Sequence, residues 1–165
     1  MTSNSMGSTT DLGDLLSYRL SIVSNLLSRS QLTGFASISD ISLPEWRALV
    51  LVKNYGPLAV KTLSRHAGQD FGQTSRLVSR MCEGGLILKR ATDDARSVDL
   101  VLTPKGRALH QRLWKIAMRC NDEFLASVSA ADRQVLFKVL DTLAGKAKSA
   151  MESSAQRTAL AENRP

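Results

Sequence analysis

The sequence predicts a mainly α-helical fold that contains one small β-hairpin. Apolar residues recur at helical spacing from Leu12 to Leu27 and again after Thr103. Between these regions, two runs rich in aliphatic and β-branched residues, "LILKRA" and "SVDLVLT", flank the charged turn "TDDAR", as in a hairpin. A chain of 165 residues with 43% hydrophobic content can bury one core, so we expect one compact unit.

The first ordered element is expected to be a helix from about Asp11 to Leu32. Its apolar stripe consists of Leu12, Leu15, Leu16, Ile22, Val23, Leu26 and Leu27. Arg19 falls within this stripe, and a Gly/Ser-containing loop completes a segment over residues 11–42. Residues 1–10 are rich in Ser and Thr, and we expect them to be disordered.

Three short helices are expected next. The first begins near Pro44, because proline at a first-turn position is pre-organised for a helix, and "NYGP" ends it. "LAVKTLSRHAG" predicts the second, closed by Gly68. The third runs from Phe71 to about Glu83, with Asp70 as N-cap, Gln73 completing a capping box, and two glycines after it.

Two longer helices follow the hairpin. Thr103 and Pro104 suit the N-cap and first position of a helix whose apolar face is Leu109, Leu113, Ile116, Cys120, Phe124 and Val128. The last helix begins near Ala130, with the stripe Val135, Leu136, Val139, Leu140, Leu143 and Ala147. Together they form a segment over residues 104–151. Residues 152–165 have no sustained apolar face and are expected to form a disordered tail.

Positive charge is concentrated in the middle of the chain. The whole sequence has 22 Lys/Arg and 15 Asp/Glu, a formal net charge of +7. Leu43 to Arg107 contains 11 Lys/Arg and 6 Asp/Glu, a net charge of +5, and the remainder has 11 and 9, a net charge of +2. The total fits nucleic acid, an anionic membrane or no specific partner, so the distribution is the more informative quantity.

Several classes of protein are disfavoured. The only cysteines, Cys82 and Cys120, form no CxxC motif and no cluster with histidine at metal spacing, so we expect neither a disulfide framework nor a metal site. "MTSNSMGSTT" lacks the features of a signal peptide, and no apolar stretch approaches the roughly 20 residues of a membrane span. We therefore expect a soluble, cytoplasmic protein.

The two short helices joined at Gly68 predict a helix-turn-helix, because the turn is tight and the second helix is polar and basic. A hairpin directly after such a helix is a wing. The helix offers amide, hydroxyl and guanidinium groups that suit base edges and phosphates, namely Gln73, Thr74, Ser75, Arg76 and Arg80. In the hairpin tip, Arg96 has the reach to enter a minor groove and Asp94 can orient it. The alternative is an ordinary surface helix with solvated arginines.

These features resemble the MarR family of transcriptional regulators over about Leu12 to Met151. "TSRLVSRMCEGGLILKR" resembles the family's recognition helix and first wing strand, "DDAR" its Asp-x-Arg wing tip, and "LVLTPKG" its LTxxG signature. Arg90 and Lys105 lie within these motifs and join the candidate DNA-binding residues. The chain departs from the pattern at Ala95, where a second arginine is common, and at Ala59, where Ser or Thr often caps the third helix.

The resemblance implies a homodimer in which residues 11–42 and 104–151 interlock and each winged lobe, residues 43–103, reaches a major groove. The apolar stripes agree, since they exceed what one small lobe can cover. Two-fold symmetry then predicts a pseudo-palindromic DNA site with half-sites roughly 10 bp apart.

Catalysis is not expected. His66 and His110 lie on separate helices, neither has a neighbouring acid or nucleophile in a recognisable arrangement, and there is no phosphate-binding glycine loop or expected cofactor. Cys120 is expected in the core, and Cys82 ends the recognition helix where a small apolar residue fits. Some relatives sense oxidants through a cysteine in the first helix, which this first helix lacks.

Ligand sensing is expected to involve Arg19, because burial of an arginine is costly unless an anion pairs with it. In resembling proteins, small aromatic acids and phenols bind between the dimerisation helices and the DNA-binding lobe. Trp46, His110 and Trp114 could line such a site. The alternative is that both tryptophans are core residues and Arg19 makes a dimer salt bridge.

The predicted function is therefore a ligand-responsive transcriptional repressor that binds double-stranded DNA as a homodimer and is released by a small aromatic carboxylate or phenol. The alternative is a winged-helix module for architectural DNA binding or protein contact, without small-molecule control.

Overall fold

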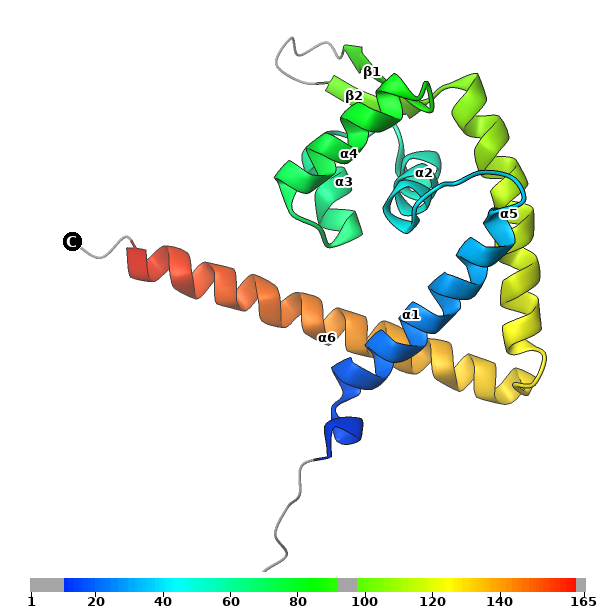
Figure 1. The fold of residues 1–165 in the computed structure, drawn as a ribbon. Coiled ribbons are helices and arrows are strands. Elements are labelled where there is room, and N and C mark those ends of the chain that lie inside the picture. The colour runs from blue at the N-terminus through cyan, green and yellow to red at the C-terminus, as the bar shows by residue number, and fades with distance from the viewer. Residues whose placement is uncertain (1–10, 92–97, 163–165) are drawn as a thin grey trace, which may run out of the picture. The chain divides into compact units, whose positions relative to one another are not determined.

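The computed structural model describes residues 11–91 and 98–162, and its elements follow the predicted order (Figure 1). They are η1 (Leu12–Asp14), α1 (Leu16–Phe35), α2 (Leu43–Tyr55), α3 (Val60–Ala67), α4 (Phe71–Glu83), β1 (Ile87–Ala91), β2 (Val98–Leu102), α5 (Pro104–Leu125) and α6 (Ala130–Glu162). The described part of the chain is mainly helical with one antiparallel hairpin, which confirms the predicted fold class.

The chain divides into two compact units, which corrects the expectation of one. The first extends to Cys120 and the second begins at Asn121. The second consists mainly of α6, and none of the described side chains of that helix is buried. The apolar stripe of α6 therefore adds nothing to a core within one chain.

Side-chain caps set the starts of three helices, and the caps of α4 and α5 were predicted. Ser42 and Glu45 form a complete capping box at α2, with the Ser42 amide donating to Glu45 Oε2 at 2.9 Å. At α4, Asp70 Oδ1 accepts from the Gln73 amide at 3.0 Å, but no reciprocal bond from the Gln73 side chain occurs among the described residues. At α5, Thr103 Oγ1 accepts from the Gly106 amide at 2.9 Å.

Residues 68–70 form the tight connection between α3 and α4. Gly68 adopts the left-handed conformation with φ 62°, which glycine reaches without the steric cost of a Cβ. Its amide donates to the Arg65 carbonyl at 3.2 Å, and the Gln69 amide donates to the Ser64 carbonyl at 3.0 Å. This turn places α3 and α4 as a helix-turn-helix beside the hairpin (Figure 1).

The hairpin has one buried face and one open face. In the register of β1 and β2, Ile87 pairs with Leu102 and Leu88 pairs with Val101. Ile87, Leu100 and Leu102 are buried, whereas Leu88 is exposed, as the alternation of side chains along a strand requires. Leu58 forms an isolated antiparallel bridge to Leu100 on the outer side of β2.

The core of the first unit draws side chains from nearly every element. The largest fully buried residues include Phe35 at the end of α1, Leu49 in α2, Leu63 in α3, Val78 and Met81 in α4, Ile87 in β1, Leu100 in β2 and Leu113 in α5. Cys120 is also buried, as predicted. The core thus holds α4 and the hairpin in a fixed relation to α2 and α5.

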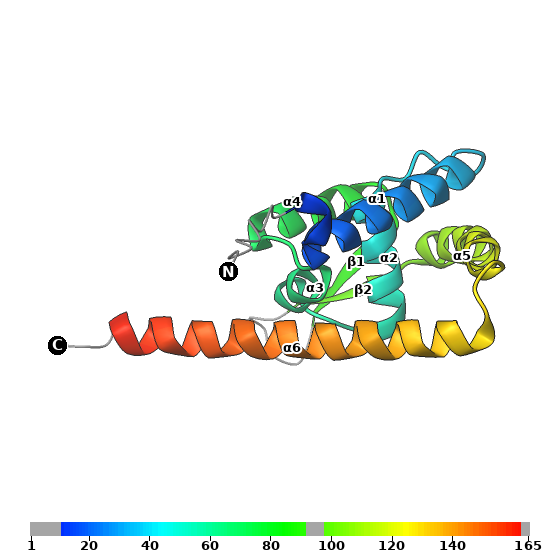
Figure 2. The ribbon, with the colours of Figure 1, turned by 90° about the horizontal axis from the view of Figure 1, so that it is seen from below.

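The structure moves three predicted helix boundaries. A 3-10 turn capped by Asp11 precedes α1, which ends at Phe35 rather than Leu32. Helix α5 ends at Leu125, so Val128 lies in the following turn. Helix α6 continues without a break to Glu162 (Figure 2), beyond the predicted limit at Met151. Residues 152–162 are rich in Ala, Glu, Gln and Arg, which favour helix without an apolar face.

Among the described residues, no helix combines the length and the apolar character needed to cross a membrane.

Candidate nucleic-acid interface and aromatic cavity

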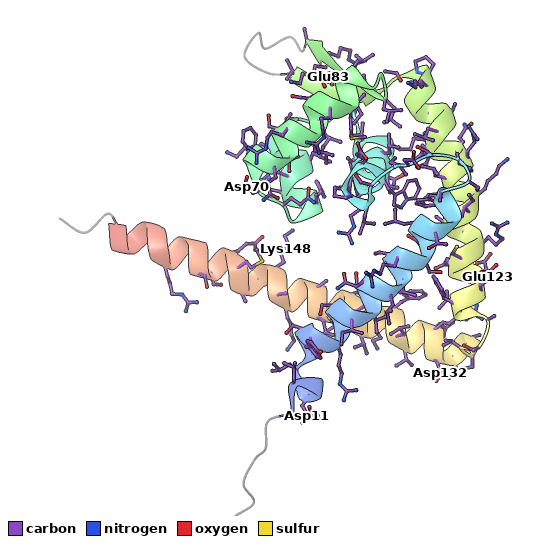
Figure 3. All side chains as sticks on the ribbon, viewed as in Figure 1. Asp11, Asp70, Glu83, Glu123, Asp132 and Lys148 are labelled. Atoms are coloured by element: carbon purple, nitrogen blue, oxygen red, sulfur yellow. The ribbon has the colours of Figure 1, made fainter. Side chains whose placement is uncertain are left out.

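Helix α4 presents one polar, cationic face. Gln73, Arg76 and Arg80 are exposed, and their spacing of three and four residues places them on one side of the helix. Ser75 beside them is half-buried. Asp70 and Glu83 mark the two ends of this helix (Figure 3). The structure therefore brings together four of the predicted DNA-contacting residues.

Thr74 is a core residue, which corrects its assignment to the DNA-binding face. Its side chain is 0% exposed, and its hydroxyl donates to the Asp70 carbonyl at 2.9 Å. A threonine in the first turn can satisfy its hydroxyl in this way when an apolar neighbourhood buries it. The sequence suggested an accessible hydroxyl because threonine is polar, but the buried stripe of α4 includes position 74 as well as Leu77, Val78 and Met81.

The remaining candidate residues lie outside α4. Arg90 is exposed on β1, on the same open face of the hairpin as Leu88. Lys105 is exposed, and its Nζ donates to the Gly84 carbonyl at 2.8 Å, so it caps the end of α4. Asp94 and Arg96 lie outside the described residues.

His66 stacks on Tyr55, and both side chains are exposed. The ring centroids are 4.7 Å apart and the planes are inclined by 15°. This contact joins the ends of α2 and α3, so His66 has a packing role that the sequence did not suggest.

An aromatic cluster joins α2 and α5. The Trp46 and His110 rings are 5.7 Å apart, and the His110 and Trp114 rings are 5.6 Å apart, in stacked arrangements. Phe35 meets Trp46 edge-on at 5.0 Å. The structure thus brings together three of the four predicted ligand-binding residues. Trp46 is a core residue, but Trp114 is 42% exposed, so the alternative of two core tryptophans holds only for Trp46.

His110 is buried and lacks a partner at one nitrogen. Among the described residues, no group hydrogen-bonds to its Nε2. Burial lowers the pKa of His110 below 6.5, and the positive charge of Lys53 lowers this pKa further. The imidazole is therefore neutral at neutral pH. Its position between the indole rings of Trp46 and Trp114 thus places no charge in the core.

A cavity of about 510 Å³ opens beside this cluster; we call it the aromatic cavity. It is lined by Lys53, Asn54, His110, Gln111, Arg112, Trp114 and Lys115. Three of these residues are cationic and none is acidic. These cations were not predicted from the sequence, although the helical spacing of Arg112 and Lys115 around Trp114 in α5 would have placed them near the cluster.

Within one chain, Arg19 does not line the aromatic cavity that His110 and Trp114 border. Its side chain is exposed, and its Nε donates to the Gly13 carbonyl in the turn before α1. The apolar stripe around it is exposed as well, so the expected cost of burying this charge does not arise within one chain.

The sequence profile described as MarR family matches residues 39–97, from the residues before α2 to the hairpin. Over these residues the chain is similar to the MarR family. This family consists of transcriptional regulators rather than enzymes, which supports the prediction that the protein is not an enzyme. Among the described residues, no group of three or more His, Cys, Asp or Glu side chains is arranged to hold a metal ion.

Relatives with known structures have the same fold. A MarR-family regulator from Silicibacter pomeroyi is 27% identical, with a TM-score of 0.73, over 85% of this chain and 95% of that chain. The organohalide-sensing regulator RdhR-CbdbA1625, in its form bound to 2,4-dichlorophenol, is 23% identical, with a TM-score of 0.71, over 88% of this chain and 89% of that chain.

Curated relatives match over a shorter length. The regulator YfiV of Bacillus subtilis is 25% identical over 105 residues, which cover 63% of this chain and 66% of that protein. The chain spans between 50% and 66% of the length of the curated relatives that it matches.

One family motif has a clear structural role here. In the LTxxG motif of this chain, Thr103 donates to the Gly85 carbonyl at 2.6 Å and caps α5 through the Gly106 amide. The motif therefore joins the start of α5 to the glycines that end α4. Ala59 stands where Ser or Thr often caps the third helix in the family. As the alanine requires, the N-cap of α3 makes no side-chain hydrogen bond.

Proposed function

We propose that this protein is a transcriptional regulator that binds double-stranded DNA through α4. The observation that carries the proposal is the exposed face formed by Gln73, Arg76 and Arg80 on a helix that follows a tight turn. Arginine and glutamine can each make paired hydrogen bonds to base edges, and arginine also binds phosphates. The buried opposite face fixes the helix in the lobe, so these side chains are presented by a rigid support.

The protein acts as a homodimer in this proposal. Large apolar side chains are exposed in the single chain on α1, including Val23 and Leu26, and on α6, including Val135 and Val139. Exposed apolar surface of this kind favours association. A two-fold dimer would present two copies of α4, which suits a pseudo-palindromic DNA site.

Control by a small aromatic anion is the second part of the proposal. The aromatic cavity offers the flat rings of His110 and Trp114 together with Lys53, Arg112 and Lys115, so it suits a ligand that has an aromatic body and a negative charge. In this proposal Lys53, Arg112 and Lys115, rather than Arg19, bind the negative charge of the ligand. The likeness to the dichlorophenol-bound regulator, at 23% identity, supports the fold only. The cavity itself therefore supports this part of the proposal.

The regulator would act as a repressor in the cytoplasm, where bacterial DNA lies, and an anion would release it from DNA. For that effect, the anion must bind more tightly to a form of the protein that fits DNA poorly. An architectural DNA-binding module would bind without sequence preference and without any response to an anion.

Selection from a random DNA library, followed by a salt titration, tests the proposal. The selected DNA should be bound at least about a thousandfold more tightly than random DNA at physiological salt. That gap should persist as salt rises, because base contacts do not depend on counterion release. Equal affinities for selected and random DNA would favour the architectural alternative.

A further inference from the structure

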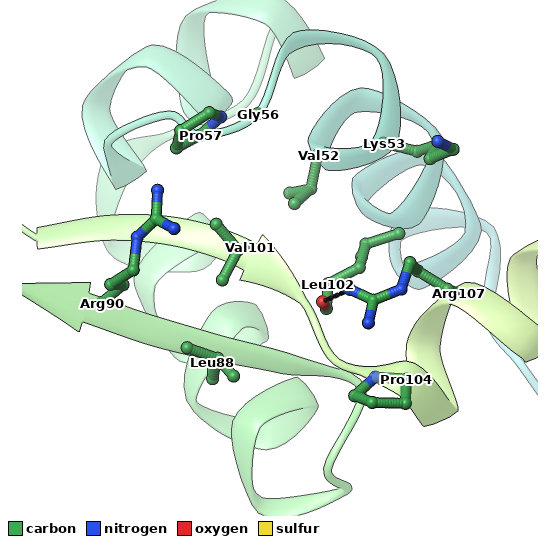
Figure 4. Close-up of a pocket in the computed structure, with 10 residues that line it drawn as sticks. All are labelled: Val52, Lys53, Gly56, Pro57, Leu88, Arg90, Val101, Leu102, Pro104 and Arg107. Atoms are coloured by element: carbon green, nitrogen blue, oxygen red, sulfur yellow. Dashed lines mark hydrogen bonds between the residues drawn. The ribbon is translucent and has the colours of Figure 1, made fainter.

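A second cavity, of about 480 Å³, lies on the open face of the hairpin (Figure 4). We call it the hairpin cavity. It is bordered by the last turn of α2, the turn at Gly56 and Pro57, the hairpin, and the first turn of α5. Its lining is Val52, Lys53, Gly56, Pro57, Leu88, Arg90, Val101, Leu102, Pro104 and Arg107.

Most of this lining is apolar. Val52 and Leu102 are buried and form part of the lobe core, while the cross-strand pair Leu88 and Val101 faces the cavity from the hairpin. Leu88 is 41% exposed. An apolar ligand surface placed here would remove this leucine from water, which is favourable by the hydrophobic effect.

Three cations from three different elements border the same cavity. Lys53 comes from α2, Arg90 from β1 and Arg107 from α5. Figure 4 shows Arg90 extending from the hairpin toward the turn at Gly56 and Pro57, with Arg107 on another side of the cavity. None of the lining residues is acidic. The cavity therefore combines an apolar floor with a positive edge.

The hydrogen-bonding capacity of these cations is largely unused. Arg107 donates one bond, from Nη1 to the Leu102 carbonyl at 2.6 Å, and a guanidinium has five N–H donors. Within the described residues, the Arg90 side chain makes no hydrogen bond and no ion pair. Asp99 lies opposite Arg90 in the strand register but does not line the cavity. Three cations and this one neighbouring acid leave a net charge of +2 at the cavity.

We propose that the hairpin cavity binds a small organic anion in which a carboxylate is joined to an apolar body. Arg90 and Arg107 would bind the carboxylate, since the guanidinium fork matches its geometry, and the floor around Val52, Leu88 and Val101 would cover the apolar body. Inorganic phosphate would leave the floor in contact with water. The phosphate backbone of DNA would also leave it uncovered.

Occupancy would join the hairpin to the helices. Arg90 belongs to β1 and Arg107 to α5. One carboxylate bound to both side chains would therefore link the hairpin to α5. This proposal goes beyond DNA binding and beyond the aromatic cavity. It can be tested on the full chain without DNA, so its failure would be distinguishable from failure of the proposed function.

The test uses 2-naphthoate and its neutral analogue 2-naphthamide, which has nearly the same shape. Each is titrated into the full-length protein, and methyl NMR signals of Val and Leu are followed together with the indole signals. We expect 2-naphthoate to shift the methyl signals of Val52, Leu88 and Val101. We expect the amide to bind at least about tenfold more weakly at this site, because it cannot form charge-assisted bonds.

Matched variants of one strand separate a specific contact from general electrostatics. Arg90→Met removes a charge that borders the cavity, and Lys89→Met removes a charge from the neighbouring residue, whose side chain points to the other face of the hairpin. We expect Arg90→Met to weaken 2-naphthoate binding about five- to tenfold, Arg90→Lys to weaken it less, and Lys89→Met to leave it unchanged. Thermal unfolding of each variant verifies that the lobe is folded.

Three outcomes would overturn the proposal. Equal affinity for the acid and the amide would show that the cations do not bind the ligand. Shifts confined to the Trp114 indole would place all binding in the aromatic cavity. If Arg90→Met left 2-naphthoate binding intact but weakened binding to random DNA, Arg90 would be a phosphate contact instead.

Discussion

A Cβ atom on Gly106 would overlap the carbonyl oxygen of Leu86, because the first turn of α5 lies directly against the junction between α4 and β1. The overlap involves backbone rather than a flexible side chain, so it cannot be relieved by a rotamer change. Glycine at this position therefore permits the close approach that Thr103 stabilises through its bond to Gly85.

The Gly106→Ala variant should accordingly lower the free energy of unfolding by about 1 to 3 kcal/mol, as overpacking does in well-packed sites. Gly145→Ala is the matched control, since a Cβ on Gly145 in α6 has no atom within 4 Å. That control should stabilise the helix by about 0.5 to 1 kcal/mol. Chemical denaturation measures both effects, and a neutral or stabilising Gly106→Ala would contradict the close packing described here.

Arg76 should control sequence choice. Replacing it with Ala should cost about 1 to 3 kcal/mol on DNA selected by the protein and much less on random DNA. Arg119→Ala removes an equal charge from an exposed position on α5 and serves as the control. Fluorescence anisotropy with both DNA types measures the difference. Equal losses on selected and random DNA would mean that Arg76 contacts only phosphates.

The apolar stripe of α6 should hold the dimer together. Leu136→Glu should shift the protein toward monomer at micromolar concentration, because it would place a charge in an apolar interface. Gln134→Glu adds the same side chain at an exposed position on the opposite side of the helix and should leave the mass unchanged. Light scattering reports the mass. A wild-type monomer, or a dimer that tolerates Leu136→Glu, would place the interface elsewhere.

His110 should titrate below pH 6.5, and Lys53 should account for the smaller part of the shift. In a His66→Gln background, His110 is the only histidine, so its NMR titration is unambiguous. Lys53→Gln should raise the pKa of His110 while leaving it below 6.5, because burial remains. Lys115→Gln should not change the pKa. A shift caused equally by both lysine variants would contradict the assigned cause.

The lowered pKa also predicts how stability depends on pH. The unfolded chain binds a proton at His110 near pH 6.5, whereas the folded chain resists protonation until a lower pH. The unfolded state therefore holds more protons in this window, and the free energy of unfolding falls as pH falls below about 6.5. His110→Phe keeps an aromatic ring and should reduce this dependence between pH 6.5 and the folded pKa. Denaturation at a series of pH values measures it, and an unchanged slope would contradict the prediction.

Local signals in the sequence predicted the fold well. The Asp and Thr caps, the proline at the start of α2 and the Gly68 turn are decided by a few neighbouring residues, so the starts of α2, α4 and α5 could be read directly. Burial of individual side chains depends on packing between distant elements. For that reason Thr74 was expected on the DNA-binding face, and Arg19 was grouped with the aromatic residues.

The candidate cavities were harder to predict because their cations come from separate elements. Lys53, Arg107 and Arg112 look like ordinary solvated charges in the sequence, and only the contact of α2 with α5 brings them to the edges of cavities. The aromatic cluster was easier to predict, because large rings on helix faces have few alternatives to packing together.

Lys53 borders both the hairpin cavity and the aromatic cavity. One ammonium group cannot be neutralised twice, so an anion in either cavity would lower the positive potential available to an anion in the other. Two such ligands would bind with negative cooperativity, and thermodynamic linkage makes the penalty the same in both directions. A ligand in one cavity would then reduce the response of the protein to a ligand in the other.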